Sequence, residues 1–197
     1  MRALASARAL GLLGPGPLEE HVASAQGFYS AIVGFGAQPP GVDIGSGGGV
    51  PGLLLASWLP DWKWTLIDAQ RRRTSFLAAQ VAALGLAGRV RVVRARTEEL
   101  AHEAEWRGQA GTVTARSFGP PPATAEAGAP LLRPGGCLIV AEPPASSDRW
   151  PEDVPSLGLR LARRVESPRR VVVLEQTGVP APEFPRPIER QRSAPVW

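Results

Sequence analysis

Hydrophobic and polar positions alternate along the chain with two different periods, which predict strands and helices in turn. Short apolar runs rich in Val, Ile and Thr have the length of buried strands, whereas apolar residues three or four apart predict helices. The clearest helical stripe begins near Arg73 and places Phe76, Leu77, Val81 and Leu84 on one face. The predicted strands are residues 42–44, 63–69, 89–95, 111–116 and 137–142. The predicted helices are residues 18–33, 53–59, 73–84 and 123–132.

The run LRLARRVESPRRVVVLEQT, residues 159–177, predicts two further strands joined by a tight turn at Ser167–Pro168. Because so short a connection has no room for a crossover helix, these strands are expected to form an antiparallel hairpin at one edge of the sheet. The earlier strands alternate with helices, which is typical of a parallel sheet. The chain is therefore predicted to be an α/β protein with a doubly wound, mostly parallel sheet of seven strands. The PGG triplet at residues 134–136 is expected to be a turn.

The length of 197 residues suits one domain with a substantial core. Within it we expect a helical leader at residues 1–40, the core sheet at residues 41–179 and a tail at residues 180–197. The tail is rich in Pro and Arg and is expected to be irregular.

Arginine dominates the charged residues: Lys63 stands beside 21 arginines, and the formal net charge is +4. Guanidinium groups can bind phosphate through two parallel hydrogen bonds. This surface therefore admits a nucleic-acid partner, although charge alone does not identify one.

The residues that usually hold metals are scarce. Cys137 is the only cysteine and His21 and His102 are the only histidines, so no disulfide framework and no metal site is expected. Cys137 follows the PGG triplet inside a strand and is interpreted as a core residue rather than a nucleophile. No apolar run approaches the roughly 20 residues that span a bilayer, and the N-terminus lacks a convincing signal-peptide cleavage site. A cytoplasmic protein without a membrane partner is expected.

The segment GVDIGSGGGVPGLLLA, residues 41–56, joins a predicted strand to a predicted helix through a loop with five glycines. Glycine permits positive φ and close approach of the backbone, and the following helix offers unpaired N–H groups. A tight strand–helix turn, which is the alternative, needs only one or two glycines. The loop is therefore predicted to hold a nucleotide-like cofactor at the carboxyl end of the sheet.

The identity of the cofactor depends on two acidic residues. Gly47, Gly49 and Gly52 match G-x-G-x-x-G with Asp68 roughly 20 residues on, which leaves a nicotinamide dinucleotide open. Asp43, however, precedes the loop within the strand, where a carboxylate repels a pyrophosphate but can reach an ammonium group directly or through water. S-adenosylmethionine is therefore favoured. Asp68 is then predicted to accept hydrogen bonds from the ribose hydroxyls; a helix N-cap is the alternative.

Five segments in order and spacing resemble the bacterial small-subunit (16S) ribosomal RNA methyltransferase G family, also called the glucose-inhibited division protein B family. They are VDIGSGGGVPGLLLA, LIDAQRRRTSFL, ARTEEL, TARSF and PLLRPGG, and the resemblance covers about residues 17–140. It implies a Rossmann-like class I methyltransferase fold, S-adenosylmethionine as cofactor, and ribosomal RNA or the 30S particle as partner.

The resemblance also implies roles for individual residues. The loop that wraps the methionine part of the cofactor corresponds to Gly45, Ser46, Gly47, Gly49 and Val50. The segment that contacts adenine corresponds to Thr97 and Glu98. The arginine that ends the fourth strand also belongs to the family's cofactor site, and it corresponds to Arg116. A surface arginine is the alternative for Arg116.

The reaction implied is methylation of guanine N7. That nitrogen has an available lone pair and needs no prior deprotonation, so catalysis reduces to alignment of N7, methyl and sulfur with water excluded. The [DN]-P-P-[YFW] motif of exocyclic-amine methyltransferases is absent after the fourth strand. No catalytic residue is therefore certain, and Arg116 is the one candidate.

Two basic segments are predicted to face RNA. Arg71, Arg72 and Arg73 open a helix, where cations oppose the helix dipole, and the family carries a basic pair at the latter two positions. The alternative is a solvated run of charges. The tail segment FPRPIERQR resembles the family's basic C-terminus and adds Arg186, Arg190 and Arg192.

Three departures from the family lie on the side of the methyl acceptor. The N-terminal region is short, Gly111 stands where an aspartate is usual, and Glu142-Pro143-Pro144 stands where Lys-Gly is usual. Two alternatives therefore stay open: a methyltransferase that acts on another acceptor, and a degenerate paralogue that binds cofactor or RNA without catalysis.

Overall fold

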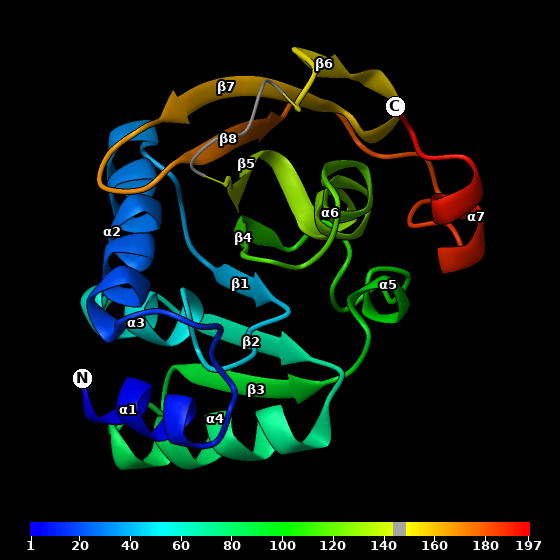
Figure 1. Cartoon of the computed structure of the whole chain (residues 1–197). Helices are drawn as coiled ribbons and strands as arrows, with labels where there is room; N and C mark the ends of the chain where they lie inside the picture. The colour runs from blue at the N-terminus through cyan, green and yellow to red at the C-terminus, as the bar shows by residue number, and fades with distance from the viewer. Residues whose placement is uncertain (144–148) are drawn as a thin grey trace.

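A computed structural model of the chain describes residues 1–143 and 149–197. Pro144, the last residue of the Glu142-Pro143-Pro144 departure, lies outside the described residues. The described residues form a sheet of eight strands in the order β3-β2-β1-β4-β5-β8-β7-β6 (Figure 1). The strands are β1 (Gly41–Ile44), β2 (Trp64–Asp68), β3 (Val90–Arg94), β4 (Ala110–Ala115), β5 (Leu132–Ala141), β6 (Asp153–Val154), β7 (Leu159–Val165) and β8 (Val171–Gln176).

Strands β1 to β5 are mutually parallel, and β8 is antiparallel to both β5 and β7. The prediction of an α/β protein with a mostly parallel sheet and a closing antiparallel hairpin is confirmed. The predicted count of seven strands is wrong by one. The additional strand, β6, has two residues and pairs with the start of β7, and so short a strand leaves no periodic pattern in the sequence.

The helices are α1 (Arg2–Ala9), α2 (Leu18–Phe35), α3 (Gly52–Trp58), α4 (Arg71–Ala83), α5 (Thr97–Leu100), α6 (Pro121–Gly128) and α7 (Ile188–Ser193). The helix predicted at residues 123–132 ends early, because the chain passes through a 3-10 turn at Ala129–Leu131 and enters β5. The PGG triplet, predicted as a turn, lies within β5, where the pairing shifts from Ala110↔Leu132 to Thr112↔Cys137. The tail, predicted as irregular, contains α7. Among the described residues, no helix is both long and apolar enough to cross a membrane.

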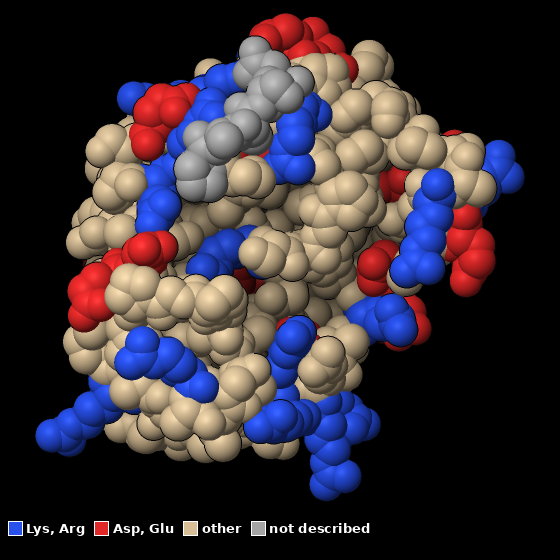
Figure 2. Space-filling model, in the orientation of Figure 1, with Lys and Arg blue, Asp and Glu red and all other residues tan. Residues whose placement is uncertain are grey.

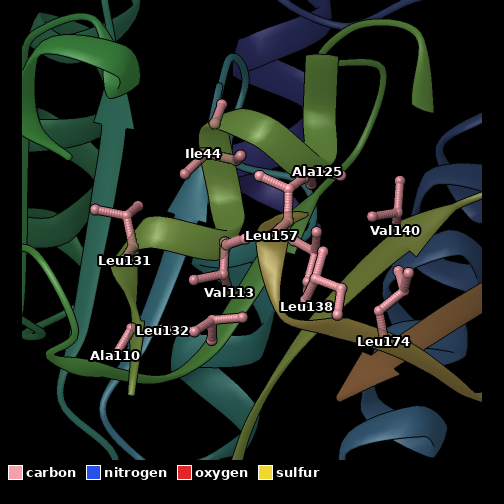
Figure 3. Packing of buried hydrophobic residues seen from close by; sticks show 14 of the residues in the cluster. Ile44, Ala110, Val113, Ala125, Leu131, Leu132, Leu138, Val140, Leu157 and Leu174 are labelled. Atoms are coloured by element: carbon pink, nitrogen blue, oxygen red, sulfur yellow. The ribbon is translucent and has the colours of Figure 1, made fainter. Parts of the chain in front are cut away.

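Two hydrophobic clusters cover the two faces of the sheet. On one face α2, α3 and α4 pack on side chains such as Trp64, Leu66 and Ile139. On the other face α5 and α6 pack on side chains such as Val113 and Leu138 (Figure 3). Ile139 and Leu138 are neighbours in β5 but face opposite clusters, as the period of a strand requires. A fully buried Leu or Ile contributes about 1.5–3 kcal/mol relative to the exposed side chain, so both faces stabilise the fold.

Cys137 belongs to the first of these clusters and is fully buried. Burial raises the pKa of its thiol to about 12, so the group stays protonated at neutral pH. This position agrees with the interpretation of Cys137 as a core residue.

The order of the strands reverses at β1, which pairs with β2 on one side and with β4 on the other. In open parallel sheets, ligands bind beyond the carboxyl ends of the strands at such a reversal. Figure 1 shows the arrowheads of β1, β2 and β3 pointing to the side on which α5, α6 and α7 lie.

Candidate functional site

The glycine-rich loop after β1 is held in one conformation by its own backbone and by β2. Gly45, Gly47 and Gly49 all have positive φ, which side chains with a Cβ rarely adopt. The Ser46 amide donates to the Ile67 carbonyl over 2.9 Å, and the Gly49 amide donates to the Ser46 carbonyl over 2.7 Å. The buried Ser46 hydroxyl donates back to the Asp43 carbonyl over 2.8 Å. The loop is therefore preformed.

Asp43 lies beneath this loop and is fully buried. One carboxylate oxygen accepts from the Gly52 amide over 3.2 Å and the other from the Thr114 hydroxyl over 2.7 Å. Burial raises the pKa of Asp43 to about 6, against the opposing effect of these hydrogen bonds. Both carboxylate oxygens thus already have partners from the protein, and Asp43 fixes the start of α3 to β4.

Asp68 ends β2 and meets the same loop from the other side. Its carboxylate accepts from the amides of Gly47 over 3.0 Å and Gln70 over 2.8 Å, and Arg73 forms an ion pair with it at 3.3 Å. The alternative that Asp68 is the N-cap residue of α4 is wrong, because Gln70 occupies that position, where its side chain makes no capping hydrogen bond. Asp68 therefore joins the glycine loop to the end of the neighbouring strand.

A cavity of about 630 Å³ opens beyond these two strand ends. Gly45 and Asp68 line it, and so do Thr97 and Glu98 at the start of α5. Four sequence-predicted residues from three different segments therefore meet in one space, which we call the nucleoside cavity after the ligand predicted for these residues. Its further lining residues from the tail are Ile188, Gln191, Arg192 and Pro195. Its size is typical of small-molecule sites.

A second cavity, of about 650 Å³, lies beside the first. We call it the acceptor cavity, because its lining includes Glu142, which was predicted to lie on the side of the methyl acceptor. Its lining includes three ion pairs: Arg169–Glu20 at 2.8 Å, Arg149–Glu142 at 2.7 Å and Arg170–Glu166 at 2.7 Å. Figure 2 shows basic and acidic side chains around a hollow in this face of the molecule. The acceptor cavity is therefore framed by charges of both signs.

Arg116, predicted to belong to the cofactor site, lines the acceptor cavity and is not among the residues that line the nucleoside cavity. Its Nε donates to the Val50 carbonyl over 3.1 Å, and its terminal nitrogen lies 3.1 Å from Nδ1 of His21 in α2. Burial, and then the charge of Arg116, lower the pKa of His21, so the imidazole stays neutral and can accept this hydrogen bond. The side chain of Val50 packs into a buried cluster with Leu4 and Leu18.

Residues Ser117, Phe118 and Gly119 line both cavities. Ser117 has φ of 55°, an uncommon value for a residue other than glycine, and such strain is found at functional sites. A Cβ on Gly45 would lie 2.9 Å from the Phe118 ring, so this ring rests on the glycine loop. The sequence analysis missed these residues, although their position directly after the strand that Arg116 ends could have indicated them.

Comparison with known proteins decides the family. A family model described as rRNA small subunit methyltransferase G matches residues 21–153. The chain belongs to this family. A ribosomal RNA small subunit methyltransferase G from Salinispora tropica is 39% identical over 168 residues, which cover 77% of this chain and 67% of that protein. One from Rubrobacter xylanophilus is 36% identical over 157 residues and is covered over 60% of its length.

The chain therefore spans about two thirds or less of these two members of the methyltransferase G family. Among solved structures, a SAM-dependent methyltransferase from Aquifex aeolicus superposes with a TM-score of 0.61 at 16% identity, over 87% of this chain and 96% of that one. Identity this low supports the fold alone, and the Rossmann-like methyltransferase fold expected from the resemblance is confirmed.

The basic residues predicted to face RNA lie in different surroundings. Arg71 is exposed at the start of α4, Arg72 donates to the Leu10 carbonyl, and Arg73 pairs with Asp68 in the nucleoside cavity. Arg186 is engaged with the buried Glu126, so its charge is neutralised within the fold. Of the remaining tail residues, Arg190 is exposed, and Arg192 lines the nucleoside cavity.

The acceptor cavity instead gathers three arginines that the sequence analysis did not single out, Arg149, Arg169 and Arg170. They follow β5 or lie near the turn between β7 and β8, and no motif marks them. Among the described residues, no group of three or more His, Cys, Asp or Glu side chains is placed to hold a metal ion.

Proposed function

We propose that this protein is an S-adenosylmethionine-dependent methyltransferase that transfers a methyl group to guanine N7 in 16S ribosomal RNA. The observation that carries the proposal is the arrangement of two cavities that share the wall Ser117–Gly119 above a preformed glycine loop. One cavity suits a cofactor, the other suits a methyl acceptor, and membership of the methyltransferase G family supports the assignment.

The nucleoside cavity has the chemistry that this cofactor requires. Asp68 presents a carboxylate that can accept hydrogen bonds from ribose hydroxyls, and Thr97 and Glu98, which line the same cavity, would contact adenine. Gly45, Gly47 and Gly49 allow the backbone to approach the methionine part, which Ser46 and Val50 flank. When bound, the cofactor supplies an electrophilic methyl group on a sulfonium centre. Asp43, buried beneath the loop, would act on the ammonium group through the loop or through water.

The acceptor cavity has the chemistry expected for an N7 acceptor. Guanine N7 attacks with its own lone pair, so the protein must orient the base and exclude water rather than remove a proton. Each of the three glutamates that line this cavity forms an ion pair with an arginine. Arg116 carries a positive charge at the inner end of this cavity, where it can donate to O6 of guanine and leave the N7 lone pair free to attack.

We propose ribosomal RNA, alone or within the 30S particle, as the partner. Arg149, Arg169 and Arg170 at the acceptor cavity, with Arg71, Arg72 and Arg190 elsewhere on the surface, would contact phosphates. Action on ribosomal RNA implies a cytoplasmic location. We also treat residues 1–197 as one catalytic domain, because leader residues Leu4 and Leu18 pack in a cluster with Val50 of the glycine loop.

The cofactor assignment is tested by calorimetric titration with S-adenosylhomocysteine. We expect Asp68→Ala to lose binding by about a hundredfold or more, because loss of this carboxylate removes the ribose acceptor and frees the Gly47 amide. Asp61→Ala is the matched control, because Asp61 is an exposed aspartate just before β2. Equal binding by both variants would contradict the assignment.

The acceptor is tested with labelled S-adenosylmethionine and 30S particles from cells that lack this protein. We expect label to appear in 16S rRNA as N7-methylguanosine, mapped by mass spectrometry, and Arg116→Ala to reduce turnover while cofactor binding persists. Incorporation into small-molecule or protein fractions, but not into rRNA, would overturn the assignment of the acceptor.

A further inference from the structure

The tail of the chain runs along the nucleoside cavity. Helix α7 and the residues after it contribute Ile188, Gln191, Arg192 and Pro195 to the same lining as Asp68. Figure 1 shows α7 beside α6 and near α5, on the side to which the strands point. More than a hundred residues of sequence thus separate these tail residues from Asp68, although all of them line one cavity.

An ion pair fastens the tail to α6. The Arg186 guanidinium donates to both oxygens of Glu126, over 2.8 Å and 2.7 Å, and the Arg186 amide also donates to Glu126 over 2.7 Å. Glu126 is fully buried in α6. The side chain of Arg186 is 16% exposed, so water screens this pair little. Gln191 donates to the Arg186 carbonyl over 2.7 Å, which connects α7 to the same ion pair.

A second attachment joins the tail to the segment that follows α5. Arg107 donates to the carbonyls of Pro180, Ala181 and Phe184 over 3.1, 3.0 and 2.7 Å. A ring nitrogen of His102 lies 2.8 Å from the Pro185 carbonyl. The tail is therefore tied both to α6 and to the region beside Thr97 and Glu98.

Helix α7 has little hydrophobic surface with which to hold its position. Gln191 is its one buried residue, and the helix has six residues, far fewer than an isolated helix needs for stability. Its place against the cavity thus depends on the polar attachments and on the buried ring of Phe184.

We propose that residues 184–195 form the outer wall of the nucleoside site, and that the Arg186–Glu126 pair positions this wall. The inference rests on the proposed function, since the ligand is the adenosine part of the cofactor. Ile188 and Arg192, four residues apart on α7, contact the nucleoside face of the ligand. The wall closes the site on the side opposite Asp68, and the loss of either the wall or its ion pair weakens nucleoside binding.

The wall itself is tested with a double variant, Ile188→Ala/Arg192→Ala. Its control is Glu189→Ala/Ser193→Ala, which changes two exposed residues of the same helix that are also four residues apart. Dissociation constants are measured by calorimetry for S-adenosylhomocysteine and for 5′-methylthioadenosine, which lacks the amino-acid part. We expect the first variant to weaken both ligands by a similar factor of about ten, and the control to stay within about twofold of the unaltered protein.

The outcomes separate this inference from the function on which it rests. If the unaltered protein binds neither ligand, the proposed cofactor is wrong. If it binds both ligands, and both double variants bind them with the same dissociation constants, the tail is not a wall of the site. Weakening of S-adenosylhomocysteine alone would place the tail at the amino-acid end and would also overturn the inference.

The positioning ion pair is tested with Glu126→Ala/Arg186→Ala, which removes both charges and leaves no unpaired charge in the core. We expect the same tenfold loss of binding for both ligands, together with faster tryptic cleavage after Arg190 and Arg192. In the unaltered protein S-adenosylhomocysteine should slow this cleavage, and in the variant it should not. A variant that keeps its thermal unfolding cooperative but shows unchanged cleavage and affinity would refute the positioning role.

Discussion

The two cavities are built from the chain in different ways. The nucleoside cavity is lined by residues that directly follow strands: Gly45 after β1, Asp68 at the end of β2 and Ala95 after β3. The acceptor cavity is lined by α2, the ends of β4 and β5, and the turn between β7 and β8. The first depends on backbone shape at a sheet edge, and the second on charged side chains brought together from distant segments.

This difference has energetic consequences. At Gly45 and Gly52 the loop packs so closely on Phe118 and Asp43 that an added Cβ would clash, so changes at these two positions affect the whole fold. An exposed ion pair at the rim of a cavity contributes about 0–1 kcal/mol to the free energy of unfolding. Substitutions there should therefore change the binding of a partner more than they change stability. We therefore expect substitutions in the glycine loop to lower stability, and substitutions at the acceptor cavity to change RNA binding.

The largest effect is expected for Gly52→Ala, on the cofactor side. Its Cβ would lie 2.5 Å from an Asp43 oxygen and 2.6 Å from a Leu66 methyl group, and both atoms are buried. Overpacking and the weakened Gly52–Asp43 hydrogen bond together should lower the free energy of unfolding by about 4 kcal/mol, as measured in urea. Gly88→Ala is the control, since nothing lies within 4 Å of a Cβ there. Similar losses of unfolding free energy in both variants would contradict the role of close packing at Gly52.

A smaller, pH-dependent effect is expected for Asp43→Asn. The pKa of Asp43 is about 6 in the folded protein and 3.8 when unperturbed, so the folded state keeps a proton that the unfolded state has already released. The stability that the protonated carboxyl of Asp43 contributes is fully present below pH 3.8, and it is lost as the pH rises through about 6. An asparagine can accept from the Gly52 amide through its oxygen and donate its own N–H to the Thr114 hydroxyl, so both contacts persist without the buried charge.

The unfolding free energy of Asp43→Asn, relative to the unaltered protein, should therefore rise by roughly 2 kcal/mol between pH 4.5 and pH 7.5. Urea titrations at the two pH values measure this change. Asp61→Asn, at an exposed position, should show little change. A difference for Asp43→Asn that does not depend on pH would mean that burial does not control this carboxyl.

The smallest effect on stability, and a clear effect on binding, is expected for Glu20→Gln at the acceptor cavity. Glu20 and Arg169 are 56% and 37% exposed, so loss of their ion pair should change stability by less than about 0.5 kcal/mol. The released Arg169 should bind one more phosphate, which steepens the salt dependence of 16S rRNA binding by about one unit. Fluorescence anisotropy at several salt concentrations measures the slope.

The control for Glu20→Gln is Glu175→Gln, which releases Arg160 on the β7–β8 pair away from this cavity. An equal change in the salt dependence of both variants would show that an arginine released anywhere on the surface adds a phosphate contact. The acceptor cavity would then have no special role in RNA binding.

Much of the nucleoside cavity could be predicted from the sequence, because its residues stand in short segments with fixed relations to strands. A glycine-rich turn must follow β1, and an acid at the end of a neighbouring parallel strand must lie at the same sheet edge. The roles of Arg73 and Arg186 could not be predicted in this way. Their partners, Asp68 and Glu126, are set by how α4 and the tail pack, and an arginine in a basic run looks the same whether it pairs with a carboxylate or faces solvent.

By itself, the sequence determined the alternation of strands and helices, the glycine loop between β1 and α3, and the family to which the chain belongs, since each of these is encoded in local patterns. Only the tertiary structure decided that the tail lines the nucleoside cavity, that Ser117–Gly119 separates two cavities, and that three arginine–glutamate pairs frame the second. The physical reason is that side chains far apart in the chain meet only after the sheet and its helices have packed.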